Sequence, residues 1–488
     1  AYFMTQITVN VADTFPRGRN LWRSLRCVDV LGEGGNVIVN LSKLKLSVYT
    51  TAKWILQGRD SASATLQTVA ARTLIIGVNV GTGIITARFL GAEGRGEQAA
   101  MILWPMFLAN TLTFGLPTSI IYNLRKHPGD RSKIFAAALL LGTLAGLLAT
   151  AIGIVLMPSL LKNYSASSIG FARLLMLNSP IVLVQLIVLS TLEATGNFAA
   201  SNRLRLLIPS ITLFLLLALV LTHSFNPYTS ALAYVVNGVP VFFWTLIQLW
   251  RTIKPQWKHL SSASIMLLSY GFRSYGVSVL GTLSSNIDQA LVVGFLEPAA
   301  MGTYVVALSL SKILNIFHSS FSTVLFPNAS ARPLEEIIAM TGRAVRLNIA
   351  AMLSIGAVVI VISPFLLSLL YGPDFVNAVP VLRILVVEVI VNGAAMILAQ
   401  AFMASGSPGI VTTLQAVGLA LSAPLMIVLI PLMGLTGAGL SLLISTTARF
   451  LFIMILFPTV LKTSPPNLVL NKEDISYLKQ KLPIFRHQ

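Results

Sequence analysis

The longest stretches of this chain contain no charged residue at all. No Asp, Glu, Lys or Arg lies between Arg205 and Arg251, or between Glu388 and Arg449. A helix that crosses a bilayer needs about 20 mostly apolar residues, so each of these stretches holds enough chain for two such helices. The turn signals Asn226-Pro227 and Pro431-Leu-Met-Gly434 break these two stretches. We therefore expect the chain to cross a membrane many times.

Composition agrees with a membrane protein and argues against a soluble one. Only 10% of the 488 residues are charged and 55% belong to the apolar set AVILMFWYC, whereas soluble domains carry roughly 25% charged residues. The net charge of +18 is spread over the gaps between apolar stretches, so it does not form the patch that nucleic-acid binding requires. The single Cys27 excludes an internal disulfide and a Cys-based metal cage, and we expect neither a metal nor another cofactor.

The apolar stretches predict an all-α polytopic membrane protein with twelve transmembrane helices in two six-helix bundles. The expected spans are residues 65–89, 97–122, 134–159, 168–192, 203–222, 229–250, 263–288, 300–325, 345–370, 379–403, 409–431 and 435–458. The expected domains are a basic, poorly ordered N-terminal tail at 1–62, an N-terminal bundle at 63–258, a C-terminal bundle at 259–460 and a second tail at 461–488.

Lys and Arg are concentrated in every second connection. Arg125, Lys126, Arg131 and Lys133 follow the second expected helix, whereas Lys162 stands alone after the third. Short cytoplasmic loops hold an excess of Lys and Arg. We therefore expect the basic connections, and both ends of the chain, on the cytoplasmic side.

The two halves of the chain resemble each other at an offset of about 206 to 210 residues. The segment FLGAEGRG at 89–96 aligns with FLEPAAMG at 295–302, and segments that begin at Arg173 and Glu193 align with segments that begin at Arg383 and Met403. Each half has an even number of expected helices, so both halves begin on the same side of the membrane. The repeat is therefore expected to be parallel, with its axis along the membrane normal.

Several motifs, in their order and spacing, resemble those of a known transporter family. They are Asn286–Leu296, Gly302-Thr-Tyr304, Ala87–Glu97, Tyr371–Phe375 and Ile430–Ala438. They resemble bacterial polysaccharide exporters and O-antigen flippases of the multidrug/oligosaccharidyl-lipid/polysaccharide exporter superfamily. The resemblance covers residues from about 65 to 460. It implies a MATE-like, V-shaped pair of six-helix bundles that alternates between inward and outward forms.

Charged side chains at bilayer depth are candidate functional residues, because each costs at least roughly 2.5–3.5 kcal/mol to insert. Arg273, Lys312 and Arg449 fall near or just past the middle of the seventh, eighth and twelfth expected helices. By the resemblance, helices seven and eight line a central cleft, in which guanidinium and ammonium groups would bind a pyrophosphate. The structural alternative is a bridge from Arg273 to Asp288, or from Lys312 to a backbone carbonyl.

Two carboxyl groups are candidates for ion coupling. Glu388 lies in the tenth expected helix and Asp288 at the outer end of the seventh, and a desolvated carboxyl can exchange a proton near neutral pH. The alternative is a buried Glu388 paired with Arg383 or Arg449. For amides at bilayer depth such as Asn178 and Gln185, the alternative to lining a cavity is a hydrogen bond between helices. The polar residues expected to line the cavity are Ser309, Asn315, Asn178, Gln185 and Asn392.

The sequence predicts a transporter rather than an enzyme, because it contains neither a GxxxxGK[ST] phosphate-binding loop nor GxSxG. The resemblance implies a flippase that moves a polyprenyl-pyrophosphate-linked oligosaccharide from the cytoplasmic to the outer leaflet of the bacterial inner membrane. Its product would be a cell-surface polysaccharide such as the O-antigen of lipopolysaccharide. The implied partners are this lipid-linked oligosaccharide, membrane lipids and a polysaccharide polymerase. An ion-coupled multidrug antiporter of the same fold is the alternative, and the mostly basic charges at bilayer depth count against it.

Overall fold

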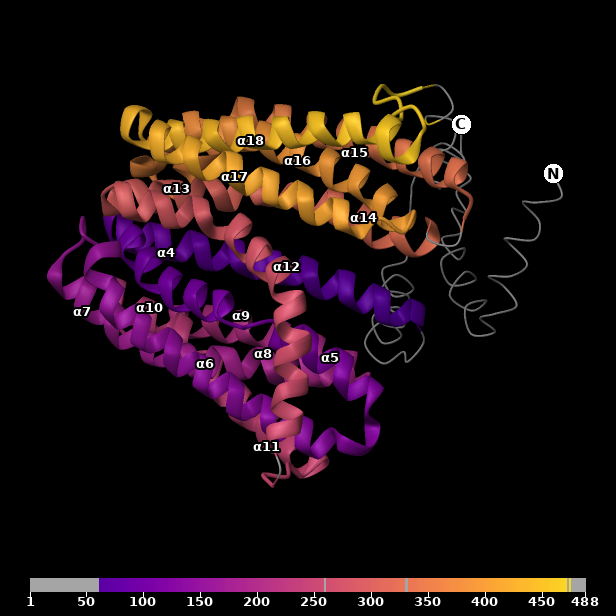
Figure 1. Ribbon diagram of the computed structural model, residues 1–488. Helices are drawn as coiled ribbons and strands as arrows, with labels where there is room; N and C mark the ends of the chain where they lie inside the picture. Colours follow the sequence, from indigo (N-terminus) through magenta and orange to yellow (C-terminus); the bar gives the residue numbers. More distant parts are fainter. Residues whose placement is uncertain (1–60, 259, 330–331, 472–473, 475–488) are drawn as a thin grey trace, which may run out of the picture. The chain divides into compact units, whose positions relative to one another are not determined.

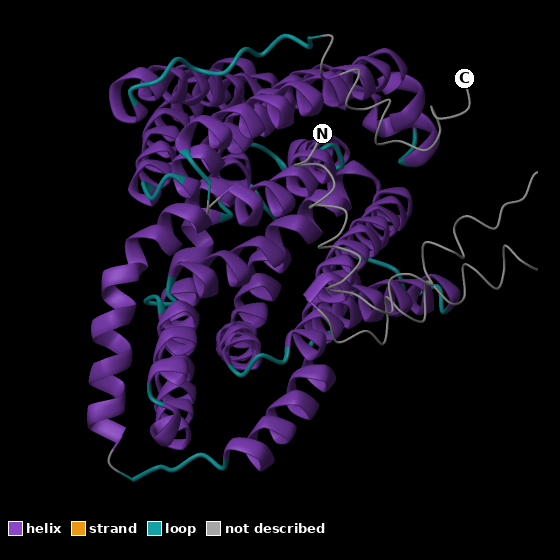
Figure 2. Cartoon of the chain, turned by 90° about the vertical axis from the view of Figure 1, so that its right-hand side faces the viewer, coloured by secondary structure: helices purple, strands orange, loops and turns teal. Residues whose placement is uncertain are grey.

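The computed structural model describes residues 61–258, 260–329, 332–471 and 474, and every regular element among them is helical (Figures 1 and 2). The expected N-terminal tail lies outside this part, except that the first described helix begins at Ser61. The chain divides into two compact units, residues 1–72 and 73–488. The packing described below is that of the second unit.

The described helices follow one another in two series of similar length. The first series is α4 (Ser61–Thr111), α5 (Leu116–Lys126), α6 (Arg131–Leu160), α7 (Ala166–Leu175), α8 (Ser179–Ala194), α9 (Phe198–Leu221), α10 (Pro227–Val236) and α11 (Val239–Ile253). The second series is α12 (Leu260–Phe295), α13 (Pro298–Lys312), α14 (Asn315–Ala329), α15 (Leu334–Leu370), α16 (Val379–Ala404), α17 (Pro408–Met433) and α18 (Leu435–Leu456). Short 3₁₀ turns precede α6, α8 and α16, and one π turn follows α18.

The expected spans correspond to helices or helix pairs of the structure. Among the described residues, nine segments are long and apolar enough to cross a membrane, and the pair α13–α14, bent by 44°, makes a tenth if it is one span. The long helix α4 covers the first expected span and the first part of the second. The Ser- and Gly-rich α12, which carries Arg273 and Asp288, is not among the nine but covers the seventh expected span.

Several expected spans differ from the structure in being broken or joined. The loop expected after residue 89 is a single residue, Gly91, whose φ of 65° turns the chain inside α4. The second span breaks at Phe114 and Gly115, with φ of 48° and 69°. Glycine adopts such left-handed conformations without the steric penalty of a Cβ, so the chain can redirect a helix within one or two residues. The eighth span is likewise interrupted directly after Lys312.

The connections between spans meet at two opposite ends of the helices. At one end, Ser168 Oγ donates to Glu97 Oε1 (3.0 Å), which joins the connections after the first and third spans. At the other end, Arg125 donates to the backbone carbonyl of Glu193 (3.0 Å), which joins the connections after the second and fourth spans. We call these the Glu97 end and the Arg125 end.

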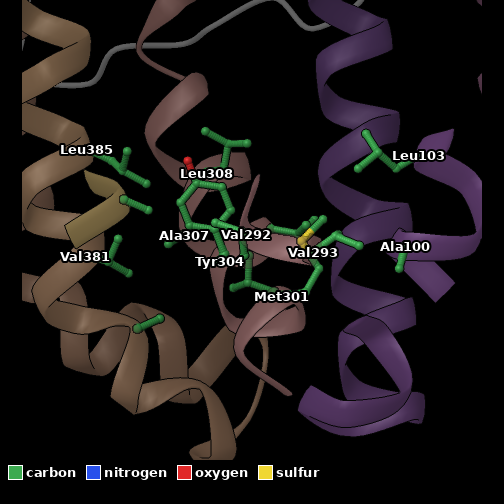
Figure 3. Close-up of a cluster of buried hydrophobic side chains, with 14 of the residues drawn as sticks. Ala100, Leu103, Val292, Val293, Met301, Tyr304, Ala307, Leu308, Val381 and Leu385 are labelled. Atoms are coloured by element: carbon green, nitrogen blue, oxygen red, sulfur yellow. The ribbon is translucent and has the colours of Figure 1, made fainter. Parts of the chain in front are cut away.

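The largest buried apolar cluster contains side chains from both halves of the chain. Figure 3 shows part of it, with Ala100 and Leu103 of α4 on one side of Tyr304 of α13, and Val381 and Leu385 of α16 on the other. A second cluster gathers residues of α5, α6, α8, α9, α11 and the start of α12. A third cluster gathers residues of α14 to α18. The two halves therefore share one core, while each also has a core of its own.

Candidate functional site

Asp288 and Tyr304 form a buried polar pair between α12 and α13. The Tyr304 hydroxyl donates to Asp288 Oδ2 (2.8 Å), and only 4% of Asp288 and none of Tyr304 is exposed. The second carboxylate oxygen, Oδ1, is buried without a hydrogen-bond partner among the described residues. Because buried polar atoms are normally hydrogen-bonded, this oxygen has an unused capacity to bind a proton or a cation.

A polar ladder joins α16 to α18. Thr446 Oγ1 donates to Glu388 Oε1 (2.7 Å), and one helical turn further along, an Arg449 guanidinium nitrogen donates to Asn392 Oδ1 (2.6 Å). Glu388 is 9% exposed. Arg449 is partly buried and also packs against Gly418 of α17. The structure therefore places Arg449 inside the helix packing of the second half.

The sequence left two alternatives for Glu388, and the structure gives it neither of the named partners. Arg383 contacts α15 instead, through the Ile360 carbonyl (3.2 Å) and Ser363 Oγ (3.3 Å). Within the described ranges, no ion pair joins Glu388 to Arg449, whose guanidinium is held by the Asn392 amide. Glu388 nevertheless lies within electrostatic range of Arg449, Lys312 and Asp288, so these ionisable groups form one loose cluster.

Arg273 and Lys312 are both exposed, on α12 and at the last residue of α13. Neither side chain forms a hydrogen bond or ion pair with another residue in the described part of the chain. The Arg273–Asp288 bridge considered above is not found, since Asp288 accepts its hydrogen bond from Tyr304. Open space adjoins α12 one turn from Arg273, where a Cβ added to Gly276 would meet no atom within 4 Å.

The expected polar lining residues fall in different places. Ser309 Oγ bonds back to the Val305 carbonyl of its own helix (2.7 Å). Asn315 is the first residue of α14, and its Oδ1 is buried without a partner among the described residues. Asn392 belongs to the α16–α18 ladder. The two amides of the first half, Asn178 and Gln185, line one cavity.

That cavity has a volume of about 320 Å³ and lies between α4, α8, α9, α10 and α11 of the first half. Besides Asn178 and Gln185, its polar lining includes Asn79, Tyr234 and Asn237. No Asp or Glu is among its lining residues within the described part. Likewise, no group of three His, Cys, Asp or Glu residues that could hold a metal occurs in the described residues.

Sequence reasoning missed several residues of these sites, among them Asn237, which also lines the cavity. Tyr304 and Thr446 are the hydrogen-bond donors to the two buried carboxyl groups, and Asn79 and Tyr234 line the cavity. For Asn79, an available signal was an amide within the uncharged stretch between Arg72 and Arg88. Tyr304 belongs to the motif Gly302-Thr-Tyr304, which marks the residue but does not show what it contacts. For Thr446 no signal exists, because Thr is an ordinary residue in spans and only the packing of helices shows its partner.

The chain is similar to a known protein family and to a probable flippase of glycan biosynthesis. A family model described as "Polysaccharide biosynthesis protein" matches residues 62–331, which is more than half of the chain. The probable low-salt glycan biosynthesis flippase Agl15 of Haloferax volcanii is 24% identical over 196 residues. That stretch is 39% of this chain and 41% of the relative, so the chain spans about two fifths of the relative's length.

Solved structures with the same fold are transporters. The inward closed conformation of the lipid II flippase MurJ has a TM-score of 0.71 at 14% identity, covering 82% of this chain and 88% of that one. An inward-facing multidrug resistance transporter of the MATE family, in the MOP superfamily, has a TM-score of 0.64 at 14% identity, with coverages of 83% and 100%. The expected MATE-like, all-helical membrane fold is therefore confirmed.

Proposed function

Because this chain belongs to the polysaccharide biosynthesis protein family, we propose that it is a flippase for a lipid-linked oligosaccharide. The substrate would be an oligosaccharide on a polyprenyl-pyrophosphate carrier, moved from the cytoplasmic to the outer leaflet by alternating access of the two halves. The family match, the multi-pass helical fold and the similarity of that fold to a lipid II flippase support the proposal. One observation on the chain itself supports a pyrophosphate-linked substrate.

That observation is the pair of exposed, unpaired cations on α12 and α13. Arg273 and Lys312 lie near the middle of their spans, where exposure to hydrocarbon would cost at least roughly 2.5–3.5 kcal/mol for each charge. The surface around them is therefore expected to be a water-filled path rather than lipid. A pyrophosphate fits such a path, because Arg binds phosphate oxygens in bidentate fashion and Lys acts as a point charge.

The buried carboxyl groups supply a second part of the proposal, the coupling of transport to an ion. Asp288 has an unpartnered oxygen, and Glu388, within electrostatic range, is held only by the Thr446 hydroxyl among the described residues. Binding of a proton or sodium ion here would change the charge between α12, α13 and α16, which belong to the core that both halves share. An ion could thereby favour one arrangement of the halves over the other.

We place the protein in the bacterial inner membrane, with the Arg125 end and both termini on the cytoplasmic side. The support is the excess of Lys and Arg in the connections at the Arg125 end. Once in the outer leaflet, the oligosaccharide would be joined to others by a polysaccharide polymerase, which is the partner we propose. The O-antigen of lipopolysaccharide is one product of this kind.

Charge reversal tests the proposal in cells that lack the native gene and make a surface polysaccharide. The variant R273E/K312E should lose surface polysaccharide and accumulate the lipid-linked precursor inside the cell. The matched control is R251E, which reverses an exposed cation at the Arg125 end and should export normally. If R273E/K312E exports as much polysaccharide as the wild type at equal protein level, both residues are removed from the mechanism.

A further inference from the structure

The cavity of the first half has hydrogen-bonding groups that the protein itself does not use. Asn79, Asn178, Gln185 and Tyr234 line it, and no side-chain amide or hydroxyl of these four residues bonds to another residue in the described part of the chain. Amides that merely join helices would be paired with each other or with backbone carbonyls. These four residues instead border one shared space of about 320 Å³.

The walls of the cavity are fixed by contacts that leave this space open. The Asn237 amide donates to the Thr212 hydroxyl, which ties α9 to the junction between α10 and α11. At that junction, Gly238 faces the Gln185 amide, and a Cβ added to Gly238 would lie 3.4 Å from Gln185 Nε2. A larger residue than glycine would therefore narrow the cavity at the Gln185 amide.

The electrostatics of the cavity select against charged ligands. Arg205, the one charged residue in the described lining, forms an ion pair with Glu193 (2.8 Å), so it does not supply a free cation for a pyrophosphate. A cationic drug would need a carboxylate, and the described lining contains none. Amides and phenols both donate and accept hydrogen bonds, which matches neighbouring hydroxyl groups that do the same. The Tyr234 ring and the Pro209 and Met106 side chains offer apolar surface for the C–H faces of a sugar ring.

We propose that this cavity binds a neutral sugar residue of the transported glycan. Its volume is at the lower end of the roughly 300–1,000 Å³ range of ligand pockets, so it holds part of a glycan rather than the whole lipid. The pyrophosphate would then be bound by Arg273 and Lys312, and the sugar by the amides of the first half. That the sugar arrives on a lipid rests on the proposed function, whereas recognition of a neutral sugar by this cavity does not.

The test uses the full chain in lipid nanodiscs and the variant N178L/Q185M, which replaces two lining amides by apolar side chains of similar size. The control is Q248M, because Gln248 is exposed on α11 of the same span and does not line the cavity. The probes are glucose, galactose, mannose and N-acetylglucosamine, with binding followed by saturation-transfer NMR. At least one sugar should bind the wild type and Q248M, and bind N178L/Q185M about tenfold more weakly because two hydrogen bonds are lost.

A second arm uses a short-chain polyprenyl pyrophosphate that carries no sugar. This probe should bind the wild type and N178L/Q185M equally. If the sugar-free lipid binds neither the wild type nor the variant while sugar binding is intact, the flippase proposal is wrong and the sugar-site proposal is kept. The variant Gly238→Val narrows the cavity without removing a lining amide and should likewise weaken sugar binding. It replaces N178L/Q185M if that variant does not fold. The sugar site is overturned if no sugar binds the wild type, or if the folded cavity variants bind it as well as Q248M does.

Discussion

Gly96 and Gly302 lie against each other where α4 crosses α13, and the contact is reciprocal. A Cβ added to Gly96 would lie 2.9 Å from the Gly302 nitrogen and overlap the Pro298 carbonyl. A Cβ added to Gly302 would lie 2.9 Å from the Gly96 nitrogen and overlap the Ala92 carbonyl. The pairs Ala92 and Pro298, and Gly96 and Gly302, have the same offset as the aligned repeat segments 89–96 and 295–302.

A reciprocal contact between equivalent residues is what a two-fold axis through that contact produces. The contact therefore supports, independently of the sequence alignment, a parallel repeat whose axis passes between Gly96 and Gly302. It also shows that the two halves touch backbone to backbone at the Glu97 end. Such an approach requires glycine on both helices, because any side chain would separate them.

The substitution Gly302→Ala should prevent this close approach and abolish transport. The added methyl group overlaps backbone of α4, so the halves cannot meet at the Glu97 end without a shift of one helix. Gly276→Ala on α12 is the matched control, because its Cβ enters open space, and it should leave transport within about twofold and be neutral or slightly stabilising, by up to ~1 kcal/mol. Transport assays with thermal unfolding in detergent distinguish the two variants. Full transport by Gly302→Ala would show that the glycine contact is dispensable.

Two buried tyrosine hydroxyls, of Tyr304 and Tyr371, should differ in what they contribute to stability. Tyr304→Phe removes the hydrogen bond that buried Asp288 accepts from Tyr304, and leaving such a group unsatisfied should destabilise the protein by roughly 1–3 kcal/mol. Tyr371→Phe should be neutral or stabilising, because its hydroxyl is buried without a partner among the described residues. Burial also raises the pKa of Tyr371 to about 12, so no ionised phenolate is lost. The prediction is wrong if both variants have the same unfolding temperature relative to the wild type.

The segment after α18 folds back onto α15 through a buried carboxylate. Arg346 donates to both oxygens of Asp474 (2.5 and 2.8 Å) and to the Asn467 carbonyl (3.3 Å). Arg343 lies 3.6 Å from the same carboxylate. The hydrogen bond from Arg346 is the chief cause that lowers the pKa of Asp474 below its ordinary value.

The pH dependence of this contact follows from the direction of that pKa shift. A carboxyl whose pKa is lowered in the folded state adds stability above its ordinary pKa of about 4, and this contribution is lost as the pH falls through the folded pKa. Asp474→Asn should therefore lower the unfolding temperature at pH 7, and the difference from the wild type should shrink below about pH 4. Asp130→Asn, at an exposed carboxylate paired with Lys133 (3.3 Å), should change little at either pH. A difference for Asp474→Asn that persists unchanged at low pH would contradict the assignment.

Removal of the buried carboxyl charges tests whether transport is coupled to an ion gradient. If Asp288 and Glu388 bind the driving ion, the double variant D288N/E388Q in proteoliposomes should transport at the same rate with and without an imposed proton or sodium gradient. The wild type should be accelerated by one of the two. The control E335Q changes a carboxyl in the first turn of α15 and should keep the wild-type response. If D288N/E388Q responds to the gradient as the wild type does, these two carboxyl groups do not bind the driving ion.

The sequence predicts the spans well because charges in apolar stretches are rare and mark their ends. The same reasoning identified Asp288 and Glu388, since a carboxyl at bilayer depth stands out against its neighbours. It is wrong about the loop expected between residues 89 and 97, because the charges of Glu93, Arg95 and Glu97 interrupt the apolar stretch without marking a loop. In the structure these charges belong to α4, and Gly91 alone makes the turn.

The contacts of the site could not be obtained from the sequence. Helical spacing shows that Asn178 and Gln185 share a face, but it does not show that Asn79 and Tyr234 face the same space from two other helices. Similarly, the charge of Arg449 is evident, whereas its hydrogen bond to Asn392 depends on the rotation of α18 against α16. Such rotations are set by packing, which local sequence patterns do not encode.

Transport by the purified protein tests the account most directly. The full chain is reconstituted in liposomes with a fluorescent polyprenyl-pyrophosphate disaccharide in both leaflets, and the fraction accessible to an external quencher is followed over time. The account predicts that the wild type moves the probe between leaflets and that R273E/K312E does not, while R251E resembles the wild type. If the wild type leaves the probe in its original leaflet but exports a cationic drug, the protein is an antiporter and the proposed substrate is wrong.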